Sequence, residues 1–163
     1  MIYSHDGTGL GHLRITLGIG AAYARRRPGD SLLLLTGSAQ AGSFSMPPSM
    51  DFVKLPSMPQ RDLYQDLPDP ASPPGPERAV VYLREMIALS AVQAFAPDLL
   101  VVDHAPAGLF RELSRAIGWL KSARPASRLV LLMRDITFGP EQTKNLWTNE
   151  LVYPLLDEAY DEI

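Results

Sequence analysis

Three uninterrupted apolar runs, separated by stretches with helical periodicity, constrain the fold of this chain more than any other feature. The runs are Ser31–Thr36, Leu99–Val102 and Arg128–Met133. None of them alternates apolar and polar residues as a half-exposed strand does. Strands without such alternation are covered on both faces, which is typical of parallel sheets. The sequence therefore predicts an α/β domain, with an open parallel Rossmann-like sheet and helices on both faces.

Two further strands, both short, and four helical stretches complete the predicted order. The short strands are Ile2–Ser4 and Asp51–Leu55. The helices are Leu13–Arg26, Glu77–Phe95, Ala107–Lys121 and a last stretch from Pro140 to about Tyr160, which Pro154 kinks or breaks. With right-handed crossovers, we predict the strand order 3-2-1-4-5 and a sixth strand that begins at Asp161–Ile163.

Composition narrows the class of protein. The 163 residues suit one domain, interrupted by the segment Pro56–Pro76, whose seven prolines predict a flexible loop. The formal net charge of −3 argues against a nucleic-acid partner. The absence of cysteine excludes disulfides, thiolate catalysis and Cys-ligated zinc. We expect neither a signal peptide nor a transmembrane segment, and a cytoplasmic location.

The segment His5–His12 joins the first predicted strand to the first helix and contains three glycines within five residues. A helix that begins at the carboxyl end of a strand presents backbone N–H groups and the positive end of its dipole to a ligand. The spacing G-x-G-x-G differs from the dinucleotide fingerprint G-x-G-x-x-G, and Thr36 stands where that fingerprint needs an acidic residue. No Gly-Lys-Ser/Thr follows, so the segment is not a P-loop. We therefore predict a ligand site of another kind.

His12 is the candidate general base of this site. A neutral imidazole accepts a proton from a hydroxyl group near neutral pH. Asp103 follows the buried run Leu99–Val102, across the switch point between the first and fourth predicted strands, where it would orient the imidazole. The alternative is that His12 and Asp103 each only cap a helix. Because the two residues flank one crevice, we favour the catalytic interpretation.

Other residues at the same edge of the predicted sheet are weaker candidates. His104 either substitutes for the base or packs locally. Arg134 follows the fifth strand and either contacts an anionic acceptor or forms a structural ion pair. His5 and Asp6 precede the glycines and line the same crevice in this interpretation, and the alternative for Asp6 is that it fixes the turn. His5, His12 and His104 lack the i, i+4 spacing of a helical zinc pair, so we expect no metal.

Residues 5–44, 97–108 and 129–136 resemble the N-terminal half of bacterial glycosyltransferases of the two-Rossmann-domain (GT-B) architecture. These enzymes are related to the transferase that forms peptidoglycan lipid II and to monogalactosyldiacylglycerol synthases. The resemblance covers nearly the whole chain and is strongest at Asp6–Arg14 and Asp98–Gly108. One departure is Ile15, which stands where related sequences tend to have a second basic residue after Arg14.

The resemblance implies metal-independent transfer of a sugar from a nucleotide-sugar donor to the hydroxyl group of a small-molecule or lipid-linked acceptor, with no cofactor. It implies that the histidine of the glycine loop is the base and that an aspartate after the fourth strand orients it, which would be His12 and Asp103. Together with the candidates above, the acceptor-binding residues would be Gly7, Thr8, Gly9, Gly11, His104 and Arg134.

In this architecture a second Rossmann domain holds most of the donor nucleotide. The 163 residues are therefore expected to be an acceptor-binding domain truncated at its C-terminus and inactive alone, with peripheral membrane contact compatible with a lipid-linked acceptor. The open alternative is a non-catalytic α/β module that binds phosphate or a nucleotide at the same helix N-terminus.

Overall fold

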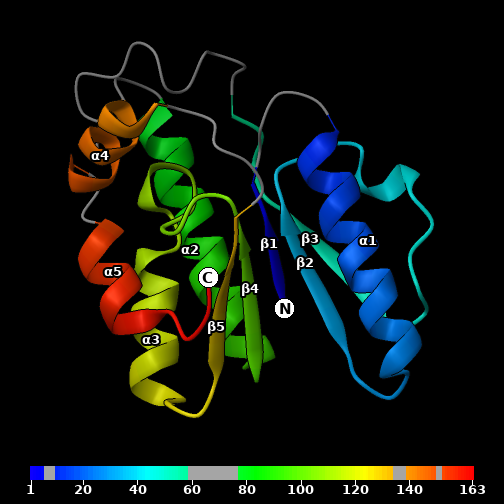
Figure 1. The fold of residues 1–163 in the computed structure, drawn as a ribbon. Helices are drawn as coiled ribbons and strands as arrows, with labels where there is room; N and C mark the ends of the chain where they lie inside the picture. The colour runs from blue at the N-terminus through cyan, green and yellow to red at the C-terminus, as the bar shows by residue number, and fades with distance from the viewer. Residues whose placement is uncertain (6–9, 59–76, 134–138, 150–151) are drawn as a thin grey trace.

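The fold is an open sheet of five parallel strands, seen in Figure 1. The computed structural model describes residues 1–5, 10–58, 77–133, 139–149 and 152–163. The spatial order is β3-β2-β1-β4-β5, which confirms the predicted order. The strands are β1 (Ile2–Ser4), β2 (Leu32–Thr36), β3 (Met50–Lys54), β4 (Leu99–Asp103) and β5 (Arg128–Leu132).

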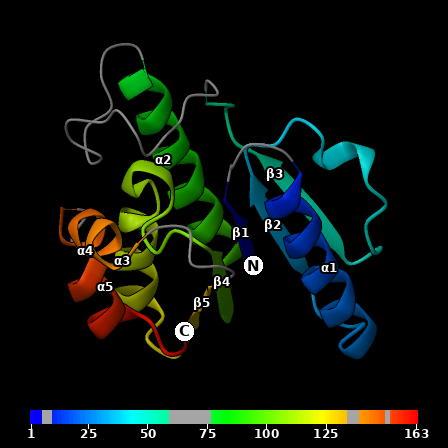
Figure 2. The same cartoon turned by 45° about the horizontal axis from the view of Figure 1, so that its top comes forward.

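Helices connect the strands and cover the two faces of the sheet. In Figures 1 and 2, α1 lies beside β2 and β3, whereas α2, α3, α4 and α5 lie together across the sheet from α1. The helices are α1 (Gly11–Arg26), α2 (Glu77–Phe95), α3 (Ser114–Ala123), α4 (Pro140–Asn149) and α5 (Val152–Ala159), with short 3-10 turns η1 (Ala41–Ser43) and η2 (Leu109–Arg111).

Neighbouring residues of each central strand belong to different cores. Ile2 and Leu34 pack in one apolar cluster with Leu13 of α1. Tyr3 and Leu35 pack in the other cluster, with residues of α2 and α3. Each fully buried aliphatic side chain contributes about 1.5–3 kcal/mol through removal of its surface from water. Burial on both faces explains why these strands read as continuous apolar runs.

The predicted helix over 107–121 is wrong in its first part. Gly108, Phe110 and Arg111 have positive φ angles of 74°, 49° and 62°. Left-handed residues cannot continue a right-handed helix. The chain therefore forms η2 there, and α3 begins only at Ser114. Elsewhere the predicted and observed boundaries agree within about two residues.

The last predicted stretch contains two helices, α4 and α5, and residues 150–151 between them lie outside the described residues. The break predicted at Pro154 is not found, because this residue lies inside α5. The first part, α4, ends at Asn149, and α5 begins at Val152. Pro154 is the third residue of α5, where a backbone N–H has no acceptor within the helix. Beyond α5, Glu162 forms a parallel bridge with Val130 of β5, at the place expected for a sixth strand. Within the described ranges, no helix combines the length and apolarity that crossing a membrane requires.

Candidate functional site

The candidate site lies at the carboxyl edge of the sheet, between β1 and β4. The chain leaves β1 for α1, on one face, and leaves β4 for α3, on the other face. Adjacent parallel strands whose connections go to opposite faces form the switch point at which open α/β sheets bind ligands. This topology brings together His5 after β1, His12 in the first turn of α1, Asp103 at the end of β4, and His104.

His12 and Asp103 form the central pair. Nδ1 of His12 lies 2.7 Å from Oδ2 of Asp103. An ionised carboxylate only accepts hydrogen bonds, so the proton of a neutral His12 ring lies on Nδ1, and Nε2 remains a proton acceptor. The side chain of Asp103 is fully buried, whereas that of His12 is 16% exposed. In this arrangement a buried carboxylate fixes the tautomer of a partly exposed imidazole.

A second donor ties Asp103 to the first strand. The backbone N–H of His5 donates to the same Oδ2 atom at 3.3 Å. Oδ2 therefore accepts hydrogen bonds from both sides of the switch point, from the end of β1 and from α1. Two donors from different elements restrict the rotation of the Asp103 side chain and so orient the ring of His12.

The imidazole rings of His5 and His104 lie close to that of His12, so three rings cluster at this pair. The ring centroids of His5 and His12 are 5.1 Å apart, those of His5 and His104 are 5.2 Å apart, and those of His12 and His104 are 5.5 Å apart. His5 is almost fully buried, with 3% of its surface exposed. His104 has a left-handed backbone with φ 67°, a conformation in which histidine is enriched among non-glycine residues. The sequence suggested that His104 lies at this site, and the structure brings its ring there.

Among the described residues, no group of three or more His, Asp or Glu side chains is placed so that it would hold a metal ion. The described side chains of the site can transfer protons and form hydrogen bonds.

The remaining predicted residues have different outcomes. Gly11 is the first residue of α1, and a Cβ added there would meet no other atom within 4 Å, so packing does not require glycine at this position. Gly7, Thr8, Gly9 and Arg134 lie outside the described residues. Their predicted contacts with the acceptor therefore remain predictions.

A buried polar network, which sequence reasoning missed, lies next to the site along β1. The phenol of Tyr3, two residues before His5, donates to Oε1 of Glu112 at 2.7 Å. Arg84 of α2 donates to both oxygens of the same carboxylate, from Nε at 2.5 Å and from its second terminal nitrogen at 2.8 Å. Arg84 and Glu112 have 0% and 1% of their surfaces exposed. We call Tyr3, Arg84 and Glu112 the Tyr-Arg-Glu network.

One sequence signal would have indicated this network. Arg84 stands at helical spacing with Val81, Ala88 and Val92, which are all buried. A charged residue within the apolar stripe of a helix requires a buried partner, because an unpaired buried charge is strongly unfavourable. The periodicity does not identify that partner as Glu112.

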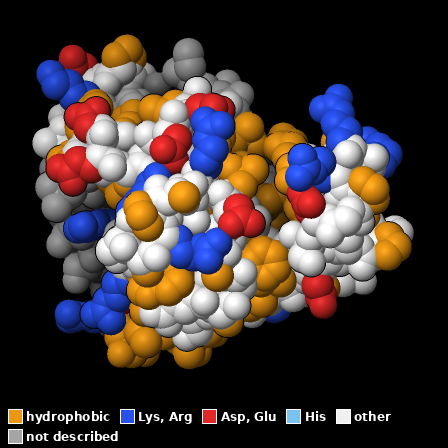
Figure 3. All heavy atoms as spheres, turned by 90° about the horizontal axis from the view of Figure 1, so that it is seen from below, with side chains coloured by type: hydrophobic (Ala, Val, Ile, Leu, Met, Phe, Trp, Pro, Cys, Tyr) orange, Lys and Arg blue, Asp and Glu red, His pale blue; other side chains and the backbone are white. Residues whose placement is uncertain are grey.

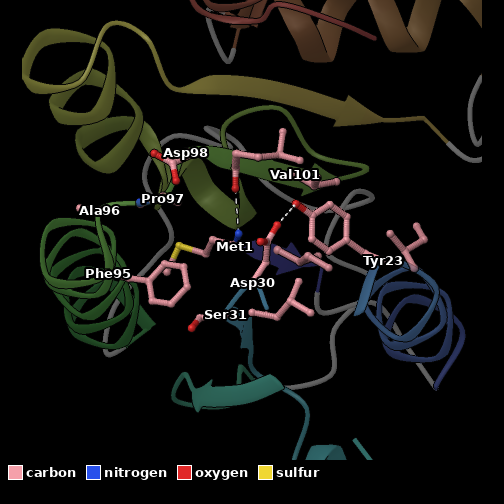
Figure 4. Close-up of a pocket in the computed structure, with 13 residues that line it drawn as sticks. Met1, Tyr23, Asp30, Ser31, Phe95, Ala96, Pro97, Asp98 and Val101 are labelled. Atoms are coloured by element: carbon pink, nitrogen blue, oxygen red, sulfur yellow. Dashed lines mark hydrogen bonds between the residues drawn. The ribbon is translucent and has the colours of Figure 1, made fainter. Parts of the chain in front are cut away.

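A separate cavity of about 400 Å³ lies at the opposite, amino edge of the sheet (Figure 4). Its walls include Tyr23, Asp30 and Phe95. The phenol of Tyr23 donates to Oδ2 of Asp30 at 2.7 Å, and this hydrogen bond raises the pKa of Tyr23 above its ordinary value. Viewed toward this edge, the molecule exposes hydrophobic side chains among scattered charged ones (Figure 3).

The position of this cavity follows from the register of β1. Ile2 pairs with Leu34, the third residue of β2, and with Val101, the third residue of β4. The cavity therefore lies beside Met1, where the neighbouring strands extend further than β1 does. Ligands of open parallel sheets bind at the carboxyl edge, so the candidate functional site remains that of His12 and Asp103.

No family model, curated protein or solved structure matches this chain.

Proposed function

We propose that this chain is the acceptor-binding domain of a metal-independent glycosyltransferase, in which His12 is the general base and Asp103 its orienting partner. The observation that carries the proposal is the 2.7 Å contact between Nδ1 of His12 and Oδ2 of Asp103 at the switch point of the sheet. The resemblance of residues 5–44, 97–108 and 129–136 to the acceptor half of GT-B enzymes supplies the reaction class. The acceptor is a hydroxyl compound, either small or lipid-linked.

In the proposed reaction, Nε2 of His12 takes the proton of an acceptor hydroxyl. The hydroxyl oxygen then forms a bond to the anomeric carbon of a nucleotide-sugar, and the bond from that carbon to the nucleotide phosphate breaks. The nucleotide leaves with the electron pair. Asp103 keeps the proton of His12 on Nδ1 and stabilises the imidazolium that forms.

The proposal is tested with His12→Ala and Asp103→Asn in the protein that carries both the acceptor and the donor domain. The assay measures release of nucleoside diphosphate from a panel of nucleotide-hexoses, in the presence of hydroxyl acceptors. A positioned base contributes about 10²–10⁴-fold to the rate. We expect losses of that order in kcat for both variants, with a smaller change in the KM for the donor.

Arg25→Ala is the matched control, because Arg25 is exposed in the last turn of α1, far along that helix from His12. It should leave kcat unchanged. Wild-type turnover by His12→Ala would remove the catalytic role of this residue. Turnover by the 163 residues alone would contradict the assignment of the chain as only the acceptor half.

One observation favours the alternative of a non-catalytic anion-binding module. The first turn of α1 contains no acidic residue, and Leu10 at its N-cap provides no side-chain hydrogen bond, which leaves the positive end of the dipole available to an anion. Calorimetric titration of the 163 residues with inorganic phosphate and with nucleoside diphosphates tests this alternative. Saturable binding, combined with unaltered turnover by His12→Ala, would favour the binding module over the transferase.

A further inference from the structure

The Tyr-Arg-Glu network contacts the segment that follows β4 and carries His104. The backbone N–H of Leu109 donates to the Tyr3 phenol at 3.0 Å, and that phenol donates to Glu112. Arg84 also donates to the carbonyl oxygen of Pro56, two residues after the end of β3, at 2.5 Å. The network thus joins β1, α2, the end of β3 and the segment between β4 and α3.

That segment has an unusual backbone. His104, Gly108, Phe110 and Arg111 have positive φ angles, so four left-handed residues fall within eight positions. Each non-glycine residue in this region is held at a cost, and it persists only where surrounding contacts determine the conformation. The contacts of Leu109 and Glu112 with Tyr3 and Arg84 are of this kind, and they lie on both sides of Phe110 and Arg111.

A buried ion pair is a poor choice when stability alone matters. Removing two charges from water offsets most of their attraction, and apolar residues of similar volume are often as stable or more stable in the same place. The Arg84–Glu112 pair is fully buried and bidentate. Its geometry is therefore better explained by the conformation that it imposes than by the stability that it adds.

We infer that Tyr3, Arg84 and Glu112 are positioning residues for the histidine site. By fixing the segment from His104 to Leu113 against β1, the network holds Asp103 and His104 in place, and through Asp103 it fixes the tautomer of His12. The relevance of this orientation to sugar transfer rests on the proposed function. The orientation itself is measurable in the 163 residues without donor or acceptor.

The test compares Tyr3→Phe with Tyr23→Phe. Both substitutions remove a phenol that donates to a carboxylate at 2.7 Å, but Tyr3 adjoins the site whereas Tyr23 lies at the opposite edge of the sheet. Ring ¹⁵N chemical shifts of His12 report its tautomer, and hydrogen exchange reports the protection of its Nδ1 proton. For Tyr3→Phe we expect a lower population of the Nδ1–H tautomer and about tenfold faster exchange, as for loss of one buried hydrogen-bond partner. For Tyr23→Phe we expect wild-type values.

A second variant keeps the inference testable if single substitutions of the ion pair prevent folding. Arg84→Met combined with Glu112→Leu replaces both charges with apolar groups, and we expect a folded protein whose His12 ring has lost its tautomer preference. If the double variant and Tyr3→Phe both keep the His12 signals of the wild type, the network serves only stability and the inference is wrong. Lost transferase activity with unchanged His12 signals would bear on the proposed function and not on the orientation of His12.

Discussion

Gly108 offers a quantitative test of how the segment between β4 and α3 is held. Its backbone angles, φ 74° and ψ −178°, lie in a region that is essentially restricted to glycine, and another residue there costs about 1–3 kcal/mol. A Cβ at this position would lie 2.8 Å from Cγ of Leu113 and 3.1 Å from Cγ of Glu112. Both side chains are buried, so this overpacking costs about 1–3 kcal/mol more. The lower entropy of unfolded alanine returns about 0.4–1 kcal/mol.

Gly108→Ala is therefore expected to lower the free energy of unfolding by about 1–5 kcal/mol. Equilibrium urea denaturation, followed by tryptophan fluorescence, measures this change. With a slope of about 2 kcal/mol per molar urea, the midpoint should fall by about 0.5–2.5 M.

Gly118→Ala is the matched control for this measurement. Gly118 is exposed within α3, and a Cβ added there would meet no atom within 4 Å. Alanine in a helix interior is more stable than glycine by about 0.5–1 kcal/mol, so this midpoint should rise slightly. If Gly108→Ala kept the wild-type midpoint while Gly118→Ala raised it, the account of a segment held in strained geometry would be refuted.

Two further predictions concern charged groups. Arg84→Met should lower the free energy of unfolding by about 3–5 kcal/mol, because it leaves Glu112 buried without its cation, and adding Glu112→Leu should recover most of this loss in the same urea assay. The carboxylate of Asp161 accepts hydrogen bonds from Nζ of Lys121 and from the backbone N–H of Leu129, and these hydrogen bonds lower its pKa below the ordinary aspartate value. The contribution of Asp161 to stability is therefore present above the unfolded-state pKa of about 3.9 and is lost as the pH falls through the lower folded-state pKa. In thermal denaturation, the difference in stability between wild type and Asp161→Asn should therefore shrink below about pH 4.

Much of the fold could be predicted from residue patterns because burial on both faces leaves a direct trace in sequence. The runs over Leu32–Thr36 and Leu99–Asp103 carry apolar side chains into two different cores, and only a parallel sheet covered on both sides requires this. The proximity of His12 and Asp103 could also be predicted, because both follow adjacent strands whose carboxyl ends must meet at one edge.

The segment after β4 could not be predicted in the same way. Residues 109–113 have ordinary helical propensity, and a helix was expected there. The conformation is decided instead by contacts with residues that are distant in sequence. Tyr3 lies 106 residues from its partner Leu109, and Arg84 lies 28 residues from its partner Glu112. Tertiary contacts of this kind override local propensity, and a single sequence does not identify them.

The central position of β1 has a consequence for the order of folding. Its residue Ile2 pairs with Leu34 on one side and with Val101 on the other. The pairing of Ile2 with Val101 closes the longer loop and therefore costs more chain entropy. It also makes native pairing slower than in folds that are built from local contacts. The contact between His12 and Asp103 spans 91 residues and needs the same closure. During synthesis, the half-sheet of β1, β2 and β3 can therefore collapse on α1 well before the histidine site exists, and that site is completed only when β4 takes its place.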